Sequence, residues 1–355
     1  MSSTMHAAVM HELNKPLVLE EIPANSATGE GVLVRVGGTG ICRTDLQMID
    51  GYFQEYAPVK PPVVPGHEIA GWVEEIGSSV PEGIIEKGNL VVVSGGWGCG
   101  LCPYCKRGDD QICPNGRWPG FIGYNGGYSE FVSVPYRYLI KIDEKYKLKP
   151  EEIAPLTDAG LTTYRAVKKA RHNLGPGKSI GIIGMGGLGH FAIQYAKILS
   201  SGSTILAFDR NDDKLDFAKQ NGADHLINIR GKKSDDIRNE VGKVTGRKEI
   251  DVVMDFVGAE EVIPIGFNML AVGGTYVSSG LVGTQIKIPL FPFVAKEYQY
   301  FGSFWGNYND LREVMELAKK GSIISRVEKF SLSDVNDALD RLREGKILGR
   351  GVLIP

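Results

Sequence analysis

The stretch SIGIIGMGGLGHFAIQYAKILS, residues 179–200, decides the fold of this chain. Its first residues, SIGIIG, form a short apolar run that predicts a buried strand, and the residues after the glycine-rich turn repeat with a helical period. Gly184, Gly186 and Gly189 form the pattern G-x-G-x-x-G between the two. Strand, glycine turn and helix in this order are typical of the first unit of a dinucleotide-binding domain.

The glycines of this turn have different expected roles. Gly184 would make the tight turn, Gly186 would let the backbone approach a pyrophosphate, and Gly189 would allow the helix to pack closely on the strand. Gly187 and Leu188 complete the loop at the positive end of the helix, where the diphosphate would sit. A glycine-rich turn without a ligand is the alternative, because a chain with 46 glycines can match the pattern by chance.

An acidic residue follows the motif at the expected distance. Asp209 lies twenty residues past Gly189 and ends the next predicted strand. Its carboxylate would accept hydrogen bonds from the adenosine ribose hydroxyls and repel a 2′-phosphate, which favours NAD over NADP. Arg210 could instead accommodate that phosphate. Lys214 could reach the ribose or be a solvated charge on the helix surface.

Strand-like and helical runs alternate around the motif, through residues 157–303. The runs STILAFD, HLINI, DVVMDFVG and GGTYVSSG are strand-like, and the alternation predicts an α/β domain with a doubly wound parallel sheet. Residues 1–156 contain short β-like runs such as VLVRVGG and NLVVVSGG, which predict an antiparallel, barrel-like domain. Residues 304–355 add two amphipathic helices and a final strand, RGVLIP.

Composition limits the classes of partner. A chain of 355 residues, 43% hydrophobic and 23% charged, fits a globular protein of two domains. Its 40 basic and 42 acidic residues argue against nucleic acid or an anionic membrane as the main partner. No apolar run approaches the ~20 residues that cross a bilayer, and no secretory signal is evident. We therefore expect a cytoplasmic protein that acts on a small molecule.

Four of the five cysteines lie within CGLCPYCKRGDDQIC, as Cys99, Cys102, Cys105 and Cys113. Four thiolates on one short loop match a closed tetrahedral zinc site, and iron–sulfur ligation is the alternative because thiolates serve both. With no open ligand position, the expected role is structural. A nucleic-acid zinc finger is disfavoured because no basic recognition helix follows the loop.

Cys42 and His67 lie in GICRTD and PGHEIAG, and a carboxylate is close to each. Either residue alone would normally be assigned to the core. Asp45 comes three residues after Cys42, however, and Glu68 follows His67. A catalytic zinc uses three protein ligands, one open position and nearby acids that orient the ligands. The local sequence supplies two ligands and leaves the third unassigned.

Together these motifs resemble the zinc-dependent medium-chain alcohol dehydrogenases over essentially the whole chain. The resemblance implies a GroES-like β-rich catalytic domain and a Rossmann domain, with the C-terminal segment returning to the catalytic domain. It further implies NAD, two zinc ions per chain and a homodimer or homotetramer. The implied activity is reversible oxidation of primary or secondary alcohols to aldehydes or ketones by hydride transfer.

The resemblance places the third catalytic zinc ligand on Asp158, in PLTDAGLTTY, where the family usually has Cys and sometimes Asp or Glu. Without it, an acid before a helix start is best explained as an N-cap. By the same resemblance, Glu68 is the acid that can exchange onto the zinc. Asp45 would hydrogen-bond His67, and Thr44 would take the alcohol proton.

Five further positions follow from the resemblance. Arg43 and Arg350 correspond to arginines that meet the cofactor diphosphate. Trp97 and Trp118 fall where the wall of the substrate pocket is built, with ordinary packing as the alternative. Gln47 stands where the family often has a histidine that ends a proton relay, and glutamine does not titrate near neutral pH.

Two other functions stay open at this point. A polyol or aldose dehydrogenase of the same superfamily is the nearer one, because those enzymes often use a carboxylate or amide as the third zinc ligand. A catalytically silent NAD-binding protein with one structural zinc is more distant. Under this alternative, the match of Cys42, His67 and Asp158 to the ligands of a catalytic zinc would be a coincidence.

Overall fold

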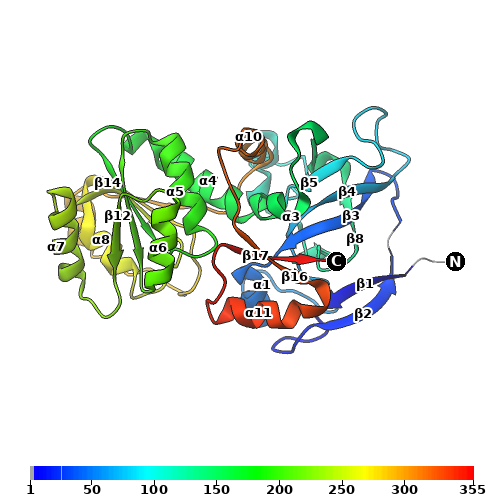
Figure 1. Ribbon diagram of the computed structural model, residues 1–355, viewed down its shortest axis with the longest axis horizontal. Coiled ribbons are helices and arrows are strands. Elements are labelled where there is room, and N and C mark those ends of the chain that lie inside the picture. Colours follow the sequence, from blue (N-terminus) through cyan, green and yellow to red (C-terminus); the bar gives the residue numbers. More distant parts are fainter. Residues whose placement is uncertain (1–3, 25) are drawn as a thin grey trace. The chain divides into compact units, whose positions relative to one another are not determined.

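The computed structural model describes residues 4–24 and 26–355 (Figure 1). The chain divides into two compact units. Unit 1 contains the residues up to 161 together with 306–355, and unit 2 contains residues 162–305. Within the described residues, each helix is too short or too polar to cross a membrane.

Unit 2 is built on a six-stranded sheet in which every neighbouring pair is parallel. The strands, in sheet order, are β12 (His225–Asn228), β11 (Thr204–Asp209), β10 (Ser179–Ile183), β13 (Ile250–Asp255), β14 (Leu270–Ser278) and β15 (Gln299–Gly302). All five residues of β10 are buried, which explains its continuous apolar sequence. The predicted doubly wound parallel sheet is confirmed, and its order reverses between β10 and β13, where such folds bind ligands.

Helices cover both faces of this sheet. Figure 1 shows α5 and α6 on one face and α7 and α8 on the other. The helices of this region are α4 (Ala159–Ala170), α5 (Gly189–Leu199), α6 (Asp212–Gln220), α7 (Ser234–Thr245), α8 (Ile263–Met269) and α9 (Leu290–Ala295). Buried Leu206, Phe208, Val253 and Phe267 belong to one apolar cluster that joins strands β11 and β13 to helix α8. The apolar faces of these helices therefore cover a sheet that is itself apolar.

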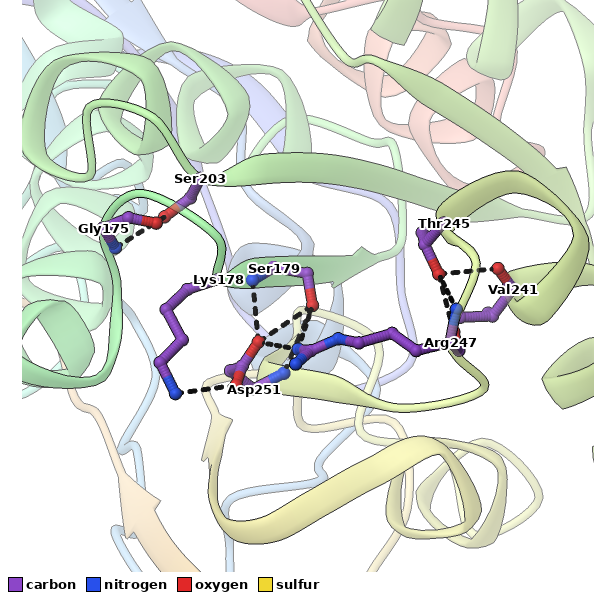
Figure 2. A network of polar contacts seen from close by, with 8 residues as sticks. All are labelled: Gly175, Lys178, Ser179, Ser203, Val241, Thr245, Arg247 and Asp251. Carbon is purple, nitrogen blue, oxygen red and sulfur yellow. Dashed lines mark hydrogen bonds and ion pairs between the residues drawn. The ribbon is translucent and has the colours of Figure 1, made fainter.

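A buried carboxylate joins the first residues of β10 and β13. Asp251 accepts hydrogen bonds from the backbone N–H of Ser179 (2.8 Å) and from its hydroxyl (3.1 Å). Lys178 Nζ lies 3.1 Å from the same carboxylate, and Arg247 forms an ion pair with it. Figure 2 shows the two cations reaching Asp251 from two sides. The network fixes these two central strands where they enter the sheet.

We expect Asp251→Asn to lower the free energy of unfolding by about 1–3 kcal/mol, because the amide cannot satisfy all four donors. Burial would raise the pKa of Asp251, but the Ser179 hydrogen bond and the charges of Lys178 and Arg247 lower it. A lowered folded-state pKa means that this stabilisation is present above about pH 4 and is lost as the pH falls through the folded-state value.

Denaturant unfolding of wild type and Asp251→Asn measures this effect. The difference should stay constant from pH 7 to pH 5 and shrink only below about pH 4. The control is Asp216→Asn, which changes an exposed aspartate on α6. Equal stability of wild type and Asp251→Asn at pH 7 would contradict the prediction.

Unit 1 is β-rich and mostly antiparallel, as predicted. Its main sheet has the order β16, β17, β3, β4, β5, β9, and β8 also pairs with β3. These strands are β3 (Gly31–Gly40), β4 (Glu68–Ile76), β5 (Leu90–Val93), β8 (Phe131–Pro135), β9 (Leu139–Ile142), β16 (Val327–Ser331) and β17 (Arg350–Ile354). The last strand of the chain, β17, pairs antiparallel with β3 and so returns to this unit.

Most of the other elements of unit 1 are short, and helix α10 is the longest of them, with 12 residues. They are β1 (Thr4–Val9), β2 (Val18–Pro23), β6 (Trp118–Pro119), β7 (Gly123–Tyr124), α1 (Arg43–Ile49), α2 (Pro103–Lys106), α3 (Pro150–Ile153), α10 (Tyr308–Lys319) and α11 (Val335–Arg343). Helix α1 follows directly from strand β3, and strand β3 is paired with β4 so that Gly40 lies opposite Glu68. This pairing brings the ends of two distant motifs together.

Candidate metal and nucleotide sites

Four potential metal ligands meet at the end of the β3–β4 pair. Cys42 is the residue before α1, Glu68 is the first residue of β4, and His67 precedes it. Asp158 follows the 3-10 helix Ala154–Thr157. One ligand atom from each of Cys42, His67, Glu68 and Asp158 lies within 4.8 Å of all the others. Three of these side chains are buried and that of Asp158 is half-buried.

One carboxylate oxygen of Asp158 lies close to both Cys42 and His67. Asp158 Oδ2 lies 3.5 Å from Cys42 Sγ and 3.4 Å from His67 Nε2. The hydroxyl of Thr44 lies 3.5 Å from the same sulfur. Thiolate, imidazole and carboxylate facing a common point form a donor set that fits Zn²⁺.

Asp45 lies behind this cluster and contacts two of its members. Its Oδ1 lies 3.2 Å from His67 Nδ1, and its Oδ2 accepts a 2.8 Å hydrogen bond from the backbone N–H of Cys42. Burial would lower the pKa of His67, but the charge of Asp45 and the hydrogen bond to Asp158 raise it well above its usual range. Metal binding at His67 therefore competes with protonation of the imidazole.

Glu68 forms a buried ion pair with Arg350. The Arg350 guanidinium bonds one carboxylate oxygen, and its Nε lies 3.4 Å from the other. Burial raises the pKa of Glu68 well above its usual range, while the charge of Arg350 opposes that shift. A Cβ atom at Gly40 would lie 1.8 Å from Glu68 Oε2, so only glycine fits there. Arg350 was expected to meet the cofactor diphosphate, and its observed partner is Glu68.

The four-cysteine loop forms a second cluster. The sulfurs of Cys99, Cys102, Cys105 and Cys113 all lie within 4.8 Å of one another, and all are free thiols. Cys102 caps α2 by accepting a hydrogen bond from the backbone N–H of Cys105. Backbone N–H groups of Leu101 and Cys102 lower the pKa of Cys99 to about 6. Four thiols that converge in this way fit a structural zinc.

The glycine-rich turn joins β10 to α5. Gly184 has a φ of +94°, which favours glycine, and a Cβ atom at Gly189 would lie 2.2 Å from the Gly184 carbonyl oxygen. A Cβ at Gly186 would meet no atom of the described residues within 4 Å, so its surroundings leave room for a ligand. Gly187 lies in the same turn, and Leu188 is the N-cap residue of α5. The geometry fits a nucleotide diphosphate.

Asp209 is anchored beside this turn. Its Oδ2 accepts a 2.7 Å hydrogen bond from the backbone N–H of Met185, inside the turn. Its Oδ1 accepts from the N–H groups of Arg210 (2.7 Å) and Asn211 (3.0 Å). The carboxylate is therefore held at the end of β11, next to the turn. Arg210 is exposed, and Lys214 is half-buried in the first turn of α6.

Two tryptophans were expected at the substrate-pocket wall. Trp97 is buried in the apolar core of unit 1, donates a hydrogen bond to the Ser94 carbonyl (2.6 Å) and stacks on Tyr138. Trp118 is half-buried, with its ring 5.5 Å from that of Phe121. The contacts of Trp97 are those of a core side chain, which matches the packing alternative.

The two remaining positions lie on helix α1. Arg43, the first residue of the helix, is exposed, and Gln47 is half-buried one turn later. Sequence reasoning did not single out Tyr128, whose buried hydroxyl donates a 2.8 Å hydrogen bond to Asp45 Oδ2. It also missed the contact between Glu68 and Arg350. No local motif marks either interaction, because the partners are far apart in sequence.

Comparison with known proteins identifies the relatives of this chain. An alcohol dehydrogenase GroES-like domain matches residues 28–144, and a zinc-binding dehydrogenase domain matches residues 187–320. An NAD-dependent alcohol dehydrogenase from Sulfurisphaera tokodaii is 41% identical over 99% of this chain and 100% of that protein. The crystal structure of the alcohol dehydrogenase from Aeropyrum pernix has a TM-score of 0.90 and 37% identity, covering 99% of this chain and 100% of that one. A D-arabinose 1-dehydrogenase (NADP(+)) from Saccharolobus solfataricus is 34% identical over 98% of this chain and 97% of that protein.

Proposed function

This chain belongs to the zinc-dependent medium-chain alcohol dehydrogenases, and on that premise we propose that Cys42, His67 and Asp158 hold its catalytic zinc. It is an NAD-dependent oxidoreductase that interconverts alcohols with aldehydes or ketones by hydride transfer. The observation that carries the ligand assignment is the position of Asp158 Oδ2, within 3.5 Å of both Cys42 Sγ and His67 Nε2. A catalytic zinc needs three such ligands and an open position.

The residues around this site have separate tasks. When bound, zinc would supply Lewis acidity and NAD would supply the hydride acceptor. Asp45 orients the His67 ring, because its Oδ1 lies 3.2 Å from Nδ1. The Thr44 hydroxyl, 3.5 Å from Cys42 Sγ, would accept the alcohol proton and pass its own proton towards the cofactor ribose. Arg350 holds Glu68, the acid that can exchange onto the metal, beside the other ligands.

The nucleotide assignment rests on the turn after β10. The turn from Gly184 to Gly189 would hold the diphosphate, and Asp209 would accept hydrogen bonds from the adenosine ribose. The carboxylate of Asp209 is fixed by three backbone N–H groups, so it cannot move away from an added 2′-phosphate. This rigidity favours NAD. Roles for Arg43, Arg210, Lys214 and Arg350 at the cofactor stay predictions.

A combined metal and substrate analysis tests the proposed function. We expect about two zinc ions per chain, and NAD-linked activity on simple alcohols that exceeds activity on sugars or with NADP. A preference for sugars would favour the aldose dehydrogenase alternative. The D-arabinose 1-dehydrogenase relative and the carboxylate ligand are the observations that support this alternative. The catalytically silent alternative is disfavoured, because the full-length relatives are enzymes. A zinc content of one per chain would overturn the ligand assignment.

We also propose that the chain forms a homodimer or homotetramer through unit 2. Large apolar side chains are exposed between residues 272 and 294, including Phe291 (82%), Leu290 (75%), Val272 (70%) and Val294 (65%). Exposed apolar patches of this kind mark protein interfaces, and analytical ultracentrifugation measures the oligomer size. A cytoplasmic location stays a proposal.

A further inference from the structure

The side chain of Tyr128 touches the carboxylate that supports the catalytic zinc site. Tyr128 is fully buried, and its hydroxyl donates a 2.8 Å hydrogen bond to Asp45 Oδ2. The same oxygen accepts from the backbone N–H of Cys42 at 2.8 Å, while Oδ1 lies 3.2 Å from His67 Nδ1. The Tyr128 hydroxyl is therefore one contact away from both the segment of Cys42 and the ring of His67.

The backbone and ring of Tyr128 contact the segment that leads to His67. The backbone N–H of Tyr128 donates to the Pro65 carbonyl at 3.0 Å, and that of Gly127 donates to the Gly66 carbonyl at 2.8 Å. A Cβ atom at Gly66 would lie 2.4 Å from Tyr128 Cδ1, so the ring packs directly on this glycine. Tyr128 thus connects the two chain segments that supply Cys42 and His67.

The Tyr128 hydroxyl supplies the second hydrogen bond to one oxygen of the buried Asp45 carboxylate. An ionised carboxylate oxygen has two acceptor positions, and Asp45 Oδ2 uses one for Cys42 and one for Tyr128. The terminal torsion of aspartate is broad, so the orientation of the carboxylate depends on its donors. Removing the hydroxyl leaves Oδ2 with one of these two donors, and a change in carboxylate orientation also moves Oδ1 relative to His67.

We propose that Tyr128 is a positioning residue of the catalytic zinc site, which acts through Asp45 to fix the orientation of His67. The proposal rests on the assignment of Cys42, His67 and Asp158 as zinc ligands. Outer partners of metal-bound histidines typically change metal affinity 10- to 100-fold when they are altered. Because Tyr128 acts one contact further out, we expect an effect near the lower end, about tenfold.

The test compares the release of the two zinc ions from the whole protein. In Tyr128→Phe the ring stays and only the hydroxyl is lost. A chromophoric chelator should remove the catalytic zinc from Tyr128→Phe about ten times faster than from wild type. The zinc at Cys99, Cys102, Cys105 and Cys113 should leave at the wild-type rate, and it serves as an internal control.

Tyr276→Phe is the matched control. Tyr276 is also fully buried, and its hydroxyl donates a 2.9 Å hydrogen bond to a buried carboxylate, Asp255 in unit 2. This variant should release both zinc ions at the wild-type rates. Cobalt substituted at the catalytic site gives a second readout, since its visible absorption depends on ligand geometry. The spectrum should change in Tyr128→Phe and stay unchanged in Tyr276→Phe.

Non-additivity tests the route through Asp45. In an Asp45→Asn background, Tyr128→Phe should have little further effect on zinc release, because the two residues act as one unit. Wild-type release rates in Tyr128→Phe, faster release of both zinc ions, or full additivity with Asp45→Asn would each overturn the proposal. A wild-type protein with only one zinc would instead overturn the assignment of Cys42, His67 and Asp158 as zinc ligands, on which the proposal rests.

Discussion

Asp158→Ala should lower kcat/KM for NAD-linked alcohol oxidation by at least about 100-fold and reduce the zinc content from about two ions per chain to about one. The reason is the ligand count. Removing Asp158 leaves Cys42 and His67 facing each other, with Glu68 held by Arg350 in a buried ion pair. A catalytic zinc needs three protein ligands, so its retention should fail while the four-cysteine site stays loaded.

Asp158→Asn separates this role from helix capping. Asparagine caps helices about as well as aspartate, whereas an Ala substitution at an N-cap costs about 1 kcal/mol. If Asp158 served only as a cap, the Asn variant would keep wild-type stability, activity and zinc. As a ligand, Asp158 supplies an anionic oxygen, so replacing it with a neutral amide should weaken zinc binding and lower activity. An Asp158→Ala protein with two zinc ions and full activity would show that the assignment is wrong.

The fold could be predicted because its signals are local. In β10 every residue is buried, and the glycine turn follows without interruption, so strand, turn and helix are visible within 179–200. The antiparallel sheet of unit 1 was likewise indicated by short runs between turns. Neither prediction needed contacts between distant residues, because hydrophobic period and turn chemistry are properties of neighbouring residues.

The site was harder to predict from the sequence than the fold, because its contacts join residues that are far apart along the chain. Asp158 lies 116 residues from Cys42, and Arg350 lies 282 residues from Glu68. Tyr128 lies 83 residues from Asp45. The pairing of β3 with β4 and β17 brings Glu68 and Arg350 together, and local periodicity does not encode that register. The family resemblance suggested Asp158 but gave no sign of Tyr128.

The burial of Trp97 could not be predicted from its neighbouring residues either. Its position suggested a pocket wall, yet the ring stacks on Tyr138 inside a cluster formed by β3, β4, β5 and β8. A tryptophan in a loop between strands has the same local sequence whether it faces a cavity or the core. The distinction depends on which strands close over it, and that follows from the sheet order.

Cys102→Ser should lower the unfolding temperature by roughly 10 °C or more and remove one zinc per chain. Zinc held by four thiolates contributes its binding energy to folding, on the order of 10 kcal/mol in small zinc domains. For domains of this size, 1 kcal/mol shifts the unfolding temperature by about 2–4 °C. Serine at position 102 can still accept the hydrogen bond with which Cys102 caps α2. The loss should therefore come from the metal and not from the helix cap.

Cys42→Ser is the matched control for Cys102→Ser, since it changes one thiol to a hydroxyl in the other cluster. It should abolish activity and release the catalytic zinc with a smaller change in unfolding temperature, because the β3–β4 pairing already holds together the segments that supply Cys42 and His67. Calorimetry with and without a chelator measures both variants. The chelator should lower the unfolding temperature of wild type and leave that of Cys102→Ser almost unchanged. The structural role of the loop would be contradicted by a Cys102→Ser protein that binds two zinc ions and unfolds at the wild-type temperature. If metal analysis instead finds iron and sulfide in the wild type, the four thiolates hold an iron–sulfur cluster.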